Sequence, residues 1–449
     1  MSAVSPGQPQ LRRVLGPWDL VLYGIVLVQP IAPVPLFGLA QQLSSGHAVA
    51  TILLAMVAMV LTAMSYGRMA ALYPSAGSAY TYVGRSLSPA AGFLTGWAMF
   101  LDYLLVPLIC TIYGAITLHR LQPSVPYAAW AAVFAALSTI LNLRGIKFTA
   151  GASQILMVVT SVVIVAFLWL AARFLVAASG WQALVSVAPF YQPDTFRWPA
   201  ILTATSVAAL TYGGFDGVST LAEEVRDPRR NVMLATVAVV LFTGIFGGLQ
   251  VYVAQLVWPE YRGFANVETA FLDVSRKVGG EWMFQSLAVV LIVASFGSAL
   301  TAQAGVSRLL YSMGRNRALP AFFGRLDART NSPAGNIVLV GVMALAGAMV
   351  LDYERSAELI NFGAFLAFMG VNAAVIRHSI AGGFREPGHG WLGGAVLPAL
   401  GFLFCFAIWL NLSRPAQLAG GAWFAVGWLF HIVQSRRRSG SGPSFDFGQ

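Results

Sequence analysis

The chain has 449 residues, of which 57% are hydrophobic and only 10% are charged, whereas an ordinary soluble domain carries about 25% charged residues. This composition excludes a typical soluble protein and predicts a polytopic membrane protein in a lipid bilayer. The net charge of +10 is accompanied by no basic groove or nucleic-acid-binding motif, so we expect no nucleic-acid partner.

Hydrophobic stretches long enough to span a membrane, roughly 20 residues each, recur along the chain. The connections between them are too short for an appended soluble domain. The sequence therefore predicts an all-α membrane protein with twelve transmembrane helices. Their expected cores are 18–40, 48–67, 90–118, 127–143, 151–175, 199–224, 232–257, 283–312, 335–351, 356–376, 392–411 and 417–433.

The basic residues are divided unevenly between the two sides of this arrangement. With a cytoplasmic N-terminus, 19 of the 27 Lys and Arg residues fall on the cytoplasmic side and 8 on the outer side. This positive-inside bias predicts that both termini are cytoplasmic. The N-terminal residues lack the pattern of a cleaved signal peptide, so we expect the first span to act as an uncleaved signal.

Two predicted spans are interrupted where a membrane helix should be continuous. The first contains QPIAPVP (29–35), whose three prolines have no backbone N–H to donate. The sixth contains TYGGFDGVST (211–220), which places three glycines around Phe215 and Asp216. Broken helices at membrane depth are tolerated where they line a cavity. Breaks five spans apart are typical of transporters built from two inverted five-helix repeats.

This pattern predicts how the chain is divided. The terminal tails are rich in Ser, Gly, Pro and Arg and are expected to be disordered and cytoplasmic. The predicted parts are an N-terminal tail (1–16), a first inverted repeat (17–180), a second inverted repeat (198–380), two further helices (390–434) and a C-terminal tail (435–449).

Two carboxylates stand in the middle of predicted spans, and no Lys or Arg does. Asp102, in GWAMFLDYLLVP, and Asp216, beside the glycine break, are costly in a bilayer and mark sites for ions, protons or cationic ligands. A cavity with two acids and no base attracts cations. Structural roles remain open, as a neutral hydrogen-bonded carboxyl for Asp102 and a helix N-cap for Asp216.

Residues around the two breaks complete the predicted substrate site. The expected substrate-binding residues are Gln29, Ile31, Ala32, Asp102, Tyr103, Tyr212, Gly213, Phe215 and Asp216. Tyr103 and Phe215 are expected to cover the substrate, with cation–π contact as one possibility and ordinary packing as the other. Glu223 and Glu224, in LAEEVRDPRR, are expected roughly 10–12 Å closer to the cytoplasm. They form a cytoplasmic gate or, alternatively, a solvated helix end.

The remaining polar residues offer no catalytic set. The five histidines stand at predicted span ends or in loops, where we expect solvated or interfacial side chains without the spacing of metal ligands. Cys110 and Cys405 fall within predicted spans and are expected to be packing residues. We therefore expect no metal, no cofactor and no enzymatic activity. A channel or sensor would need a continuous polar pore or a signalling domain, and neither is visible.

Four blocks of the sequence resemble the amino acid, polyamine and organocation (APC) transporter superfamily. They are YPSAGSAYTYVGRSLSPAAGFLTGWAMFLDYLLVP (73–107), GGFDGVSTLAEEVRDPRRNV (213–232), SRLLYSMGRNRALP (307–320) and LINFGAFLAFMGVN (359–372). The first span is most similar to the bacterial putrescine importer branch. The resemblance implies a LeuT-like fold, with a 5+5 inverted-repeat core, broken helices 1 and 6 and two extra C-terminal helices. It also implies the bacterial cytoplasmic (inner) membrane, a site between spans 1, 3, 6, 8 and 10, and ion-driven alternating access.

Three departures from the family pattern bear on substrate and coupling. Amino-acid carriers hold the substrate carboxylate with N–H groups of a glycine-rich first break, which the prolines here cannot supply, and this favours an amine without an α-carboxylate. Putrescine importers carry an aspartate at the position of Pro35, which leaves the ammonium groups of a diamine to Asp102 and Asp216. Proton-coupled relatives often carry a lysine at the position of Thr160, so a lysine-based proton switch is excluded.

Three possibilities remain for the driving force of transport: a proton, a sodium ion, or no coupling ion. Asp102 aligns with an acid of proton-coupled relatives and can bind a proton, whereas sodium would need hydroxyls such as Thr160, Ser295 and Ser298 together with carbonyls of the first break. We expect H+ rather than Na+, with uniport or exchange still open.

The sequence as a whole predicts a secondary active importer of a cationic amine or polyamine such as putrescine. The alternative is a proton- or sodium-coupled amino-acid permease for neutral or cationic amino acids. In that case the substrate carboxylate binds N–H groups around Gly213, Gly214 and Gly217.

Overall fold

The computed structural model describes residues 13–75, 77–145, 150–315, 319–327, 332–381 and 392–437. Most of the two predicted tails, 1–16 and 435–449, lies outside these residues. Within the described ranges all regular secondary structure is helical apart from one isolated bridge, which confirms the all-α prediction. The α-helices are α1 Pro17–Val28, α2 Phe37–Leu43, α3 Ala48–Leu72, α4 Ser78–Ser86, α5 Pro89–Leu121, α6 Tyr127–Leu143, α7 Ala150–Ser179, α8 Trp198–Ala208, α9 Pro228–Val257, α10 Ala270–Arg315, α11 Ala334–Val350, α12 Tyr353–Ile380, α13 Leu397–Leu410 and α14 Arg414–Arg437.

Eight helices in the described part of the chain are long and apolar enough to cross a membrane: α3, α5, α7, α9, α10, α12, α14 and α13 with the residues before it. They coincide with eight of the predicted spans. Shorter apolar helices, α6 and α11, occupy two more, and α1 covers the first part of the first predicted span. The count of twelve spans remains a prediction.

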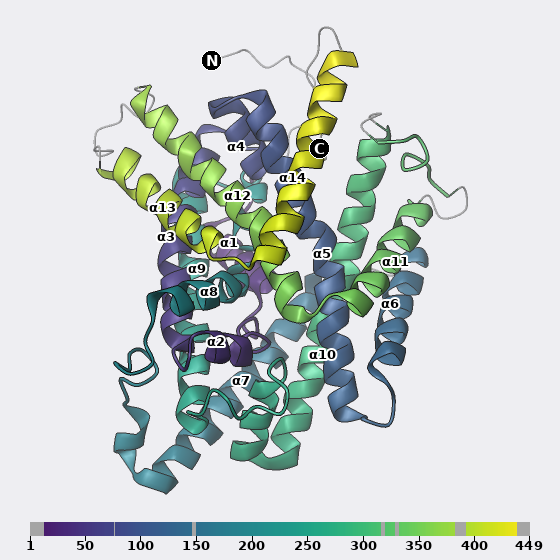
Figure 1. The fold of residues 1–449 in the computed structure, drawn as a ribbon. Helices are drawn as coiled ribbons and strands as arrows, with labels where there is room; N and C mark the ends of the chain where they lie inside the picture. The colour runs from purple at the N-terminus through teal and green to yellow at the C-terminus, as the bar shows by residue number, and fades with distance from the viewer. Residues whose placement is uncertain are drawn as a thin grey trace.

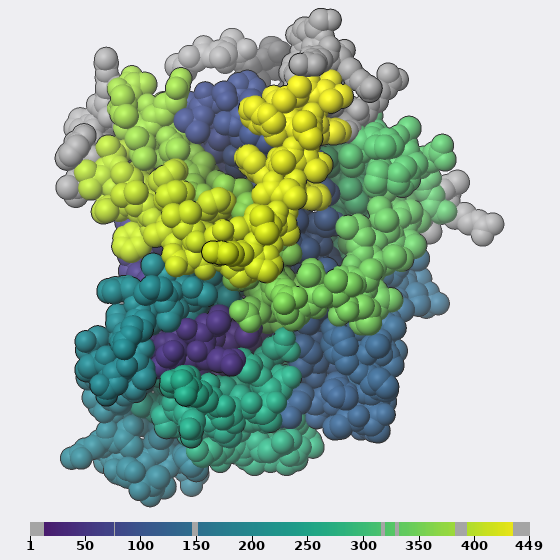
Figure 2. Space-filling model, viewed as in Figure 1, coloured from purple at the N-terminus to yellow at the C-terminus, as the bar shows by residue number. Residues whose placement is uncertain are grey.

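Small residues allow the helices at the centre of the bundle to pack closely. α3 lies along α9, and α5 contacts both α10 and α12. A methyl group on Gly67 of α3 would collide with Met233 of α9, and one on Gly244 of α9 would collide with Met56 of α3. Such close approach of backbones is a usual source of helix association in membranes. α14 lies along the front face of the molecule, where it packs on α5 (Figures 1 and 2).

The first predicted break is present between α1 and α2. α1 ends at Val28, and the eight residues 29–36 form successive turns instead of a helix. Gln29 has a φ of 63°, which an L-residue adopts only at a cost of about 1–2 kcal/mol. The carbonyl of Pro30 accepts a hydrogen bond from the side-chain amide of Gln250 on α9 (2.8 Å). The freed backbone of the break is thus partly satisfied from a neighbouring helix, as membrane depth requires.

The second break is present too, but the chain after it differs from the prediction. α8 ends at Ala208 and continues as a short 3-10 helix to Tyr212. Gly214 then takes a φ of 99°, a conformation that favours glycine. The next segment, Phe215–Leu221, is a 3-10 helix instead of the expected continuation of an α-helical span. Gly214 and Gly217 both lie against Leu27, so the two breaks meet in space.

Candidate functional site

A cavity of about 890 Å³ lies where the two breaks meet, and its size falls in the range of small-molecule sites. Its walls come from the first break, α5, α7, the second break, α10 and α12. Eight of the nine predicted substrate-binding residues line it: Gln29, Ile31, Ala32, Asp102, Tyr103, Tyr212, Gly213 and Asp216. The exception is Phe215.

The two predicted acids face this cavity from different elements. Asp102 stands on α5 and Asp216 in the first turn after Gly214, and both side chains are half-buried against the cavity. They lie close enough for a charge on Asp216 to act on Asp102. The expectation that no base shares the cavity is wrong, because Arg308 of α10 also lines it. Arg308 stands near the end of a predicted span, so hydropathy gave no reason to place it in the cavity. Only the folded structure shows that it lies on the side of α10 that faces the cavity.

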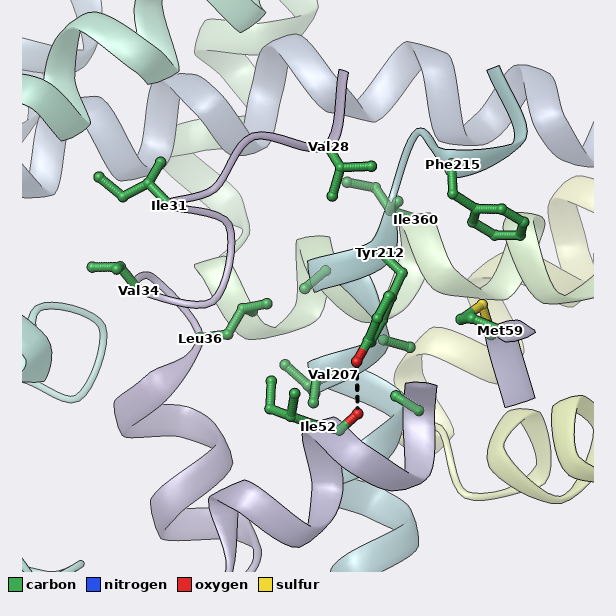
Figure 3. Packing of buried hydrophobic residues seen from close by; sticks show 14 of the residues in the cluster. Val28, Ile31, Val34, Leu36, Ile52, Met59, Val207, Tyr212, Phe215 and Ile360 are labelled. Carbon is green, nitrogen blue, oxygen red and sulfur yellow. Dashed lines mark hydrogen bonds between the residues drawn. The ribbon is translucent and has the colours of Figure 1, made fainter. Parts of the chain in front are cut away.

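The aromatic residues of the predicted site divide into three cases. Tyr103 is 41% exposed although it lies in the middle of α5, and it lines the cavity beside Asp102. The fully buried Tyr212 donates its hydroxyl to the carbonyl of Ile52 on α3 (2.8 Å; Figure 3). This bond fixes the second break to α3. Tyr212 therefore forms part of the cavity wall and does not cover the substrate.

Phe215 does not cover the substrate as predicted. Its ring is fully buried and packs against Tyr66 (5.7 Å between ring centroids) and Phe368 (5.2 Å). Successive residues of a 3-10 helix point about 120° apart, so Phe215 turns into the core where Asp216 turns to the cavity. Phe368, which sequence reasoning missed, does line the cavity.

The predicted ion-coupling hydroxyls lie on the wall formed by α7 and α10. Thr160, Ser295 and Ser298 all line the cavity. The side-chain amide of Gln29 donates a hydrogen bond to the Ser298 hydroxyl (3.1 Å) and ties the first break to α10. An amide N–H therefore takes an oxygen lone pair that a sodium ion would use. Sequence reasoning placed Gln29 with the substrate and missed this tie.

The predicted cytoplasmic gate residues are close to the N-terminal segment, outside the cavity wall. The backbone carbonyl of Glu224 accepts hydrogen bonds from the N–H groups of Val14 (2.9 Å) and Leu15 (3.0 Å). The N–H of Arg226 donates to Leu15 O (2.9 Å) in return. The start of α1 is thus joined to the chain that lies beyond the second break. A gating role for the Glu223 and Glu224 side chains stays a prediction.

The cavity has two different ends. Toward the chain termini it is lined by the start of α4 and by the exposed Gly305 and Arg308 near the end of α10 (Figure 1). At the opposite end the loop before α10 packs on α2. There Phe37 contacts the rings of Phe264 (5.8 Å) and Phe271 (5.5 Å) edge-on. The carbonyl of Val267 lies so close to Gly38 that no side chain fits between them.

Two buried polar residues correct other expectations. His47 is fully buried instead of solvated or interfacial. Both ring nitrogens have partners inside the protein: Nδ1 contacts Ser44 O (2.8 Å), and Nε2 accepts a hydrogen bond from the N–H of Gln192 (3.1 Å). Glu358, near the start of α12, is a fully buried carboxylate at the edge of the predicted span 356–376, and sequence reasoning missed it. It accepts hydrogen bonds from the N–H (2.9 Å) and the hydroxyl of Ser413, and so holds the start of α14.

Comparisons with known proteins agree with this architecture. The profile of the family described as "amino acid permease" matches residues 31–381, well over half of the chain. The chain belongs to the amino acid permease family. This permease is 33% identical to the low-affinity putrescine importer PlaP of Escherichia coli K12, over 94% of this chain and 93% of that protein. The resemblance expected from the four sequence blocks is therefore confirmed.

Other relatives of the permease carry different substrates in their names. It is 28% identical to cationic amino acid transporter 4, vacuolar, of Arabidopsis thaliana, over 82% of this chain and 64% of that protein. It is 25% identical to the branched-chain amino acid permease BcaP of Bacillus subtilis, over 97% of this chain and 96% of that protein. Among solved structures it is similar to MhsT in complex with L-phenylalanine, with a TM-score of 0.61 and 15% identity over 91% of this chain and 100% of that chain. This last likeness shows the fold alone.

Proposed function

We propose that the protein is a secondary active transporter that imports a cationic amine or polyamine, similar to putrescine, by alternating access. It would sit in the bacterial cytoplasmic membrane with both termini in the cytoplasm. The observation that carries the proposal is that Asp102 and Asp216 face one cavity beside a break filled with prolines. The 33% identity to a putrescine importer over nearly the whole chain supports it.

The residues around the cavity have separate roles in this proposal. Asp216 binds the ammonium group of the substrate, and Asp102 binds a second ammonium or a proton. A charge-assisted hydrogen bond to a carboxylate is about twice as strong as a neutral one. The half-exposed ring of Tyr103, next to Asp102, offers a cation–π contact to the alkylammonium chain. The carbonyls of Gln29, Ile31 and Ala32 add acceptors for its N–H groups.

The conformation supports alternating access with the cavity facing the cytoplasm. The end of the cavity near the termini has exposed residues on its wall, whereas loop 258–269 packs on α2 at the other end. The start of α1 and the chain after the second break are bound to each other through Leu15 and Glu224. We infer that these two segments move together when the cytoplasmic side closes.

The alternative function, transport of an amino acid, is favoured by the BcaP and Arabidopsis relatives. It requires donors for a substrate carboxylate near the breaks. However, the N–H of Gly213 already donates to Leu210 O (3.0 Å), and the N–H of Gly217 donates to Gly214 O (3.0 Å). Two of the three glycine N–H groups expected to bind a carboxylate are therefore used within the turns, which supports the amine.

Thermal stabilisation of the purified protein tests the substrate class. A ligand present at 100 times its Kd stabilises a protein by about 2.7 kcal/mol. We expect putrescine, cadaverine or spermidine to raise the Tm, and their parent amino acids to leave it unchanged. The variant Asp216→Asn, of equal size and without the charge, should lose the shift. Stabilisation by amino acids and not by amines would replace the proposal with the amino-acid alternative.

A further inference from the structure

The end of the cavity away from the termini is lined by two tyrosines. Tyr113 of α5 and Tyr353 of α12 both line it, with ring centroids 5.4 Å apart and ring planes at 51°. Tyr113 stands eleven residues after Asp102 on the same helix, which corresponds to about 16 Å along the helix axis. Val106, Ile109 and Cys110 line the stretch of wall between them. This end is therefore a separate place from the site of the two aspartates.

A carboxylate that forms no ion pair among the described residues lies against the backbone of Tyr353, outside the residues that line the cavity. Glu268, in the loop before α10, is half-buried, and its Oε1 accepts a long hydrogen bond from the N–H of Tyr353 (3.4 Å). Among the residues that the structure describes, no Lys or Arg forms an ion pair with Glu268. Burial raises the pKa of Glu268, the Tyr353 N–H lowers it and Asp352 raises it, so that the pKa lies above its ordinary value. A cation bound nearby would stabilise its charged form.

The hydroxyl of Tyr113 provides an independent sign of a missing ligand. Tyr113 is 2% exposed, and its hydroxyl makes no hydrogen bond of standard geometry in the described part of the chain, although the Thr117 hydroxyl lies near it. Leaving such a group unsatisfied costs about 1–3 kcal/mol. Tyr113 is linked to Glu268 through Tyr353, whose N–H donates to the carboxylate and whose ring centroid lies 5.4 Å from that of Tyr113. Asp352 and Glu354 stand close by, and only Asp352 pairs with a cation, Arg355. The acids nearest to Glu268 therefore outnumber the bases, whereas Arg120, Arg276 and Lys277 gather on another side of the loop.

We propose that Glu268, Tyr113 and Tyr353 form a second, outer station that binds one primary ammonium group of the amine before it reaches Asp102 and Asp216. Glu268 supplies the negative charge, the two rings supply cation–π faces, and the Tyr113 hydroxyl accepts an N–H. The inference rests on the proposed function, because its ligand is the same amine. The distance of about 16 Å along α5 is too long for one ammonium group to contact both places at once. The outer station therefore acts by itself and not as part of the aspartate site.

The present conformation holds the outer station closed. Loop 258–269 packs on α2 through Val267, and Glu268 is turned onto the backbone of Tyr353. When this loop leaves α2, the carboxylate and both rings become accessible from outside. The outer station therefore binds amine that arrives from outside, and it has no part in the release of amine to the cytoplasm. This difference separates it from the aspartate site in transport measurements.

Transport in proteoliposomes tests the outer station with Glu268→Gln, which removes the charge and keeps the shape. We expect the KM for external putrescine to rise at least fivefold, with Vmax, the KM for efflux and the thermal stabilisation by putrescine unchanged. Glu281→Gln is the matched control, because Glu281 lies on α10, the helix that follows the loop of Glu268, is exposed and is paired with Arg276. It should change the external KM less than twofold. Tyr113→Phe, which removes only the hydroxyl, should raise the external KM by a smaller factor.

Cys110 provides a second readout that does not depend on transport. It lines the cavity three residues before Tyr113, whereas Cys405, the other of the two cysteines, is fully buried. A cationic methanethiosulfonate applied from outside should label Cys110 several times faster than a neutral one of similar size. Glu268→Gln should remove this preference, and putrescine should slow the labelling of the wild type.

The possible results distinguish the outer station from the proposed function. If Glu268→Gln changes neither the external KM nor the charge preference at Cys110, while Asp216→Asn abolishes amine binding, the outer station is wrong and the proposed function stands. If Asp216→Asn leaves amine binding intact, the proposed function fails, and the outer station fails with it. If the external KM rises equally in Glu268→Gln and Glu281→Gln, the rise comes from the loss of surface negative charge in general. The outer station is then wrong.

Discussion

Trp97 and Trp423 are joined by two reciprocal hydrogen bonds. The indole N–H of Trp97 donates to the carbonyl of Trp423 (2.9 Å), and the indole N–H of Trp423 donates to the carbonyl of Trp97 (3.0 Å). The two rings are stacked with centroids 4.9 Å apart. Because Trp97 precedes Asp102 by five residues on α5, this pair fixes the helix that carries one of the two cavity acids to α14.

The pair predicts a specific loss of stability in Trp423→Phe. Phenylalanine keeps an aromatic ring for stacking and removes the donated hydrogen bond, so we expect a loss of about 1 kcal/mol and a Tm lower by a few degrees in detergent. Trp409→Phe is the control, since the buried indole N–H of Trp409 has no partner in the described part of the chain. A drop of equal size in both variants would mean that lost ring area, and not the reciprocal bonds, determines the effect.

The locations of the breaks and of the acids could be predicted from the sequence because both violate simple rules. Prolines at membrane depth and glycines in a span interrupt a helix wherever the rest of the chain lies, and a carboxylate in a bilayer stands out in any hydropathy plot. The Pro30 and Gly214 breaks are therefore found where they were expected. This part of the prediction needs no knowledge of how the rest of the chain folds.

The parts that could not be predicted depend on rotation and on distant contacts. Phe215 and Asp216 are neighbours in sequence, and the rotation of the segment after Gly214 sends Phe215 into the core and Asp216 to the cavity. The bonds from Gln29 to Ser298 and from Trp97 to Trp423 join residues hundreds of positions apart. No local pattern encodes such pairs. These pairs come from the way the helices pack against one another. Hydropathy does not determine how each helix is rotated relative to its neighbours.

Gly38 is predicted to control closure of the outer end of the cavity. In Gly38→Ala the new methyl group would collide with the carbonyl of Val267, so the loop before α10 can no longer pack on α2. We expect at least tenfold slower transport with amine binding retained, and faster labelling of Cys110 from outside. Gly421→Ala on α14, where a methyl group meets open space, should behave as wild type. Unchanged labelling of Cys110 in Gly38→Ala would show that the loop closes by another contact.

Asp102 is predicted to be the proton-binding group. Asp102→Asn keeps the size and hydrogen-bonding shape of the side chain but cannot be protonated or charged. We expect uptake against a gradient, driven by an inwardly directed pH difference, to be lost, while exchange of labelled for unlabelled putrescine continues. Asp216→Asn is the contrast, because there the KM for the amine should rise tenfold or more in both assays, about 1.4 kcal/mol of binding energy. Uptake by Asp102→Asn that still depends on the pH difference would exclude Asp102 as the coupling group.

The hydrogen bond from Gln29 to Ser298 predicts how the protein responds to sodium. Because the amide occupies the Ser298 hydroxyl, we expect replacement of sodium by choline to leave putrescine uptake unchanged. A double-mutant cycle with Gln29→Leu and Ser298→Ala should give a coupling of about 0.5–1.5 kcal/mol in unfolding free energy. Ser295→Ala, on the same wall of the cavity, combined with Gln29→Leu should give additive losses. Faster uptake in sodium would mean that the amide yields its place to the ion, and that the hydroxyls of α7 and α10 form a sodium site during transport.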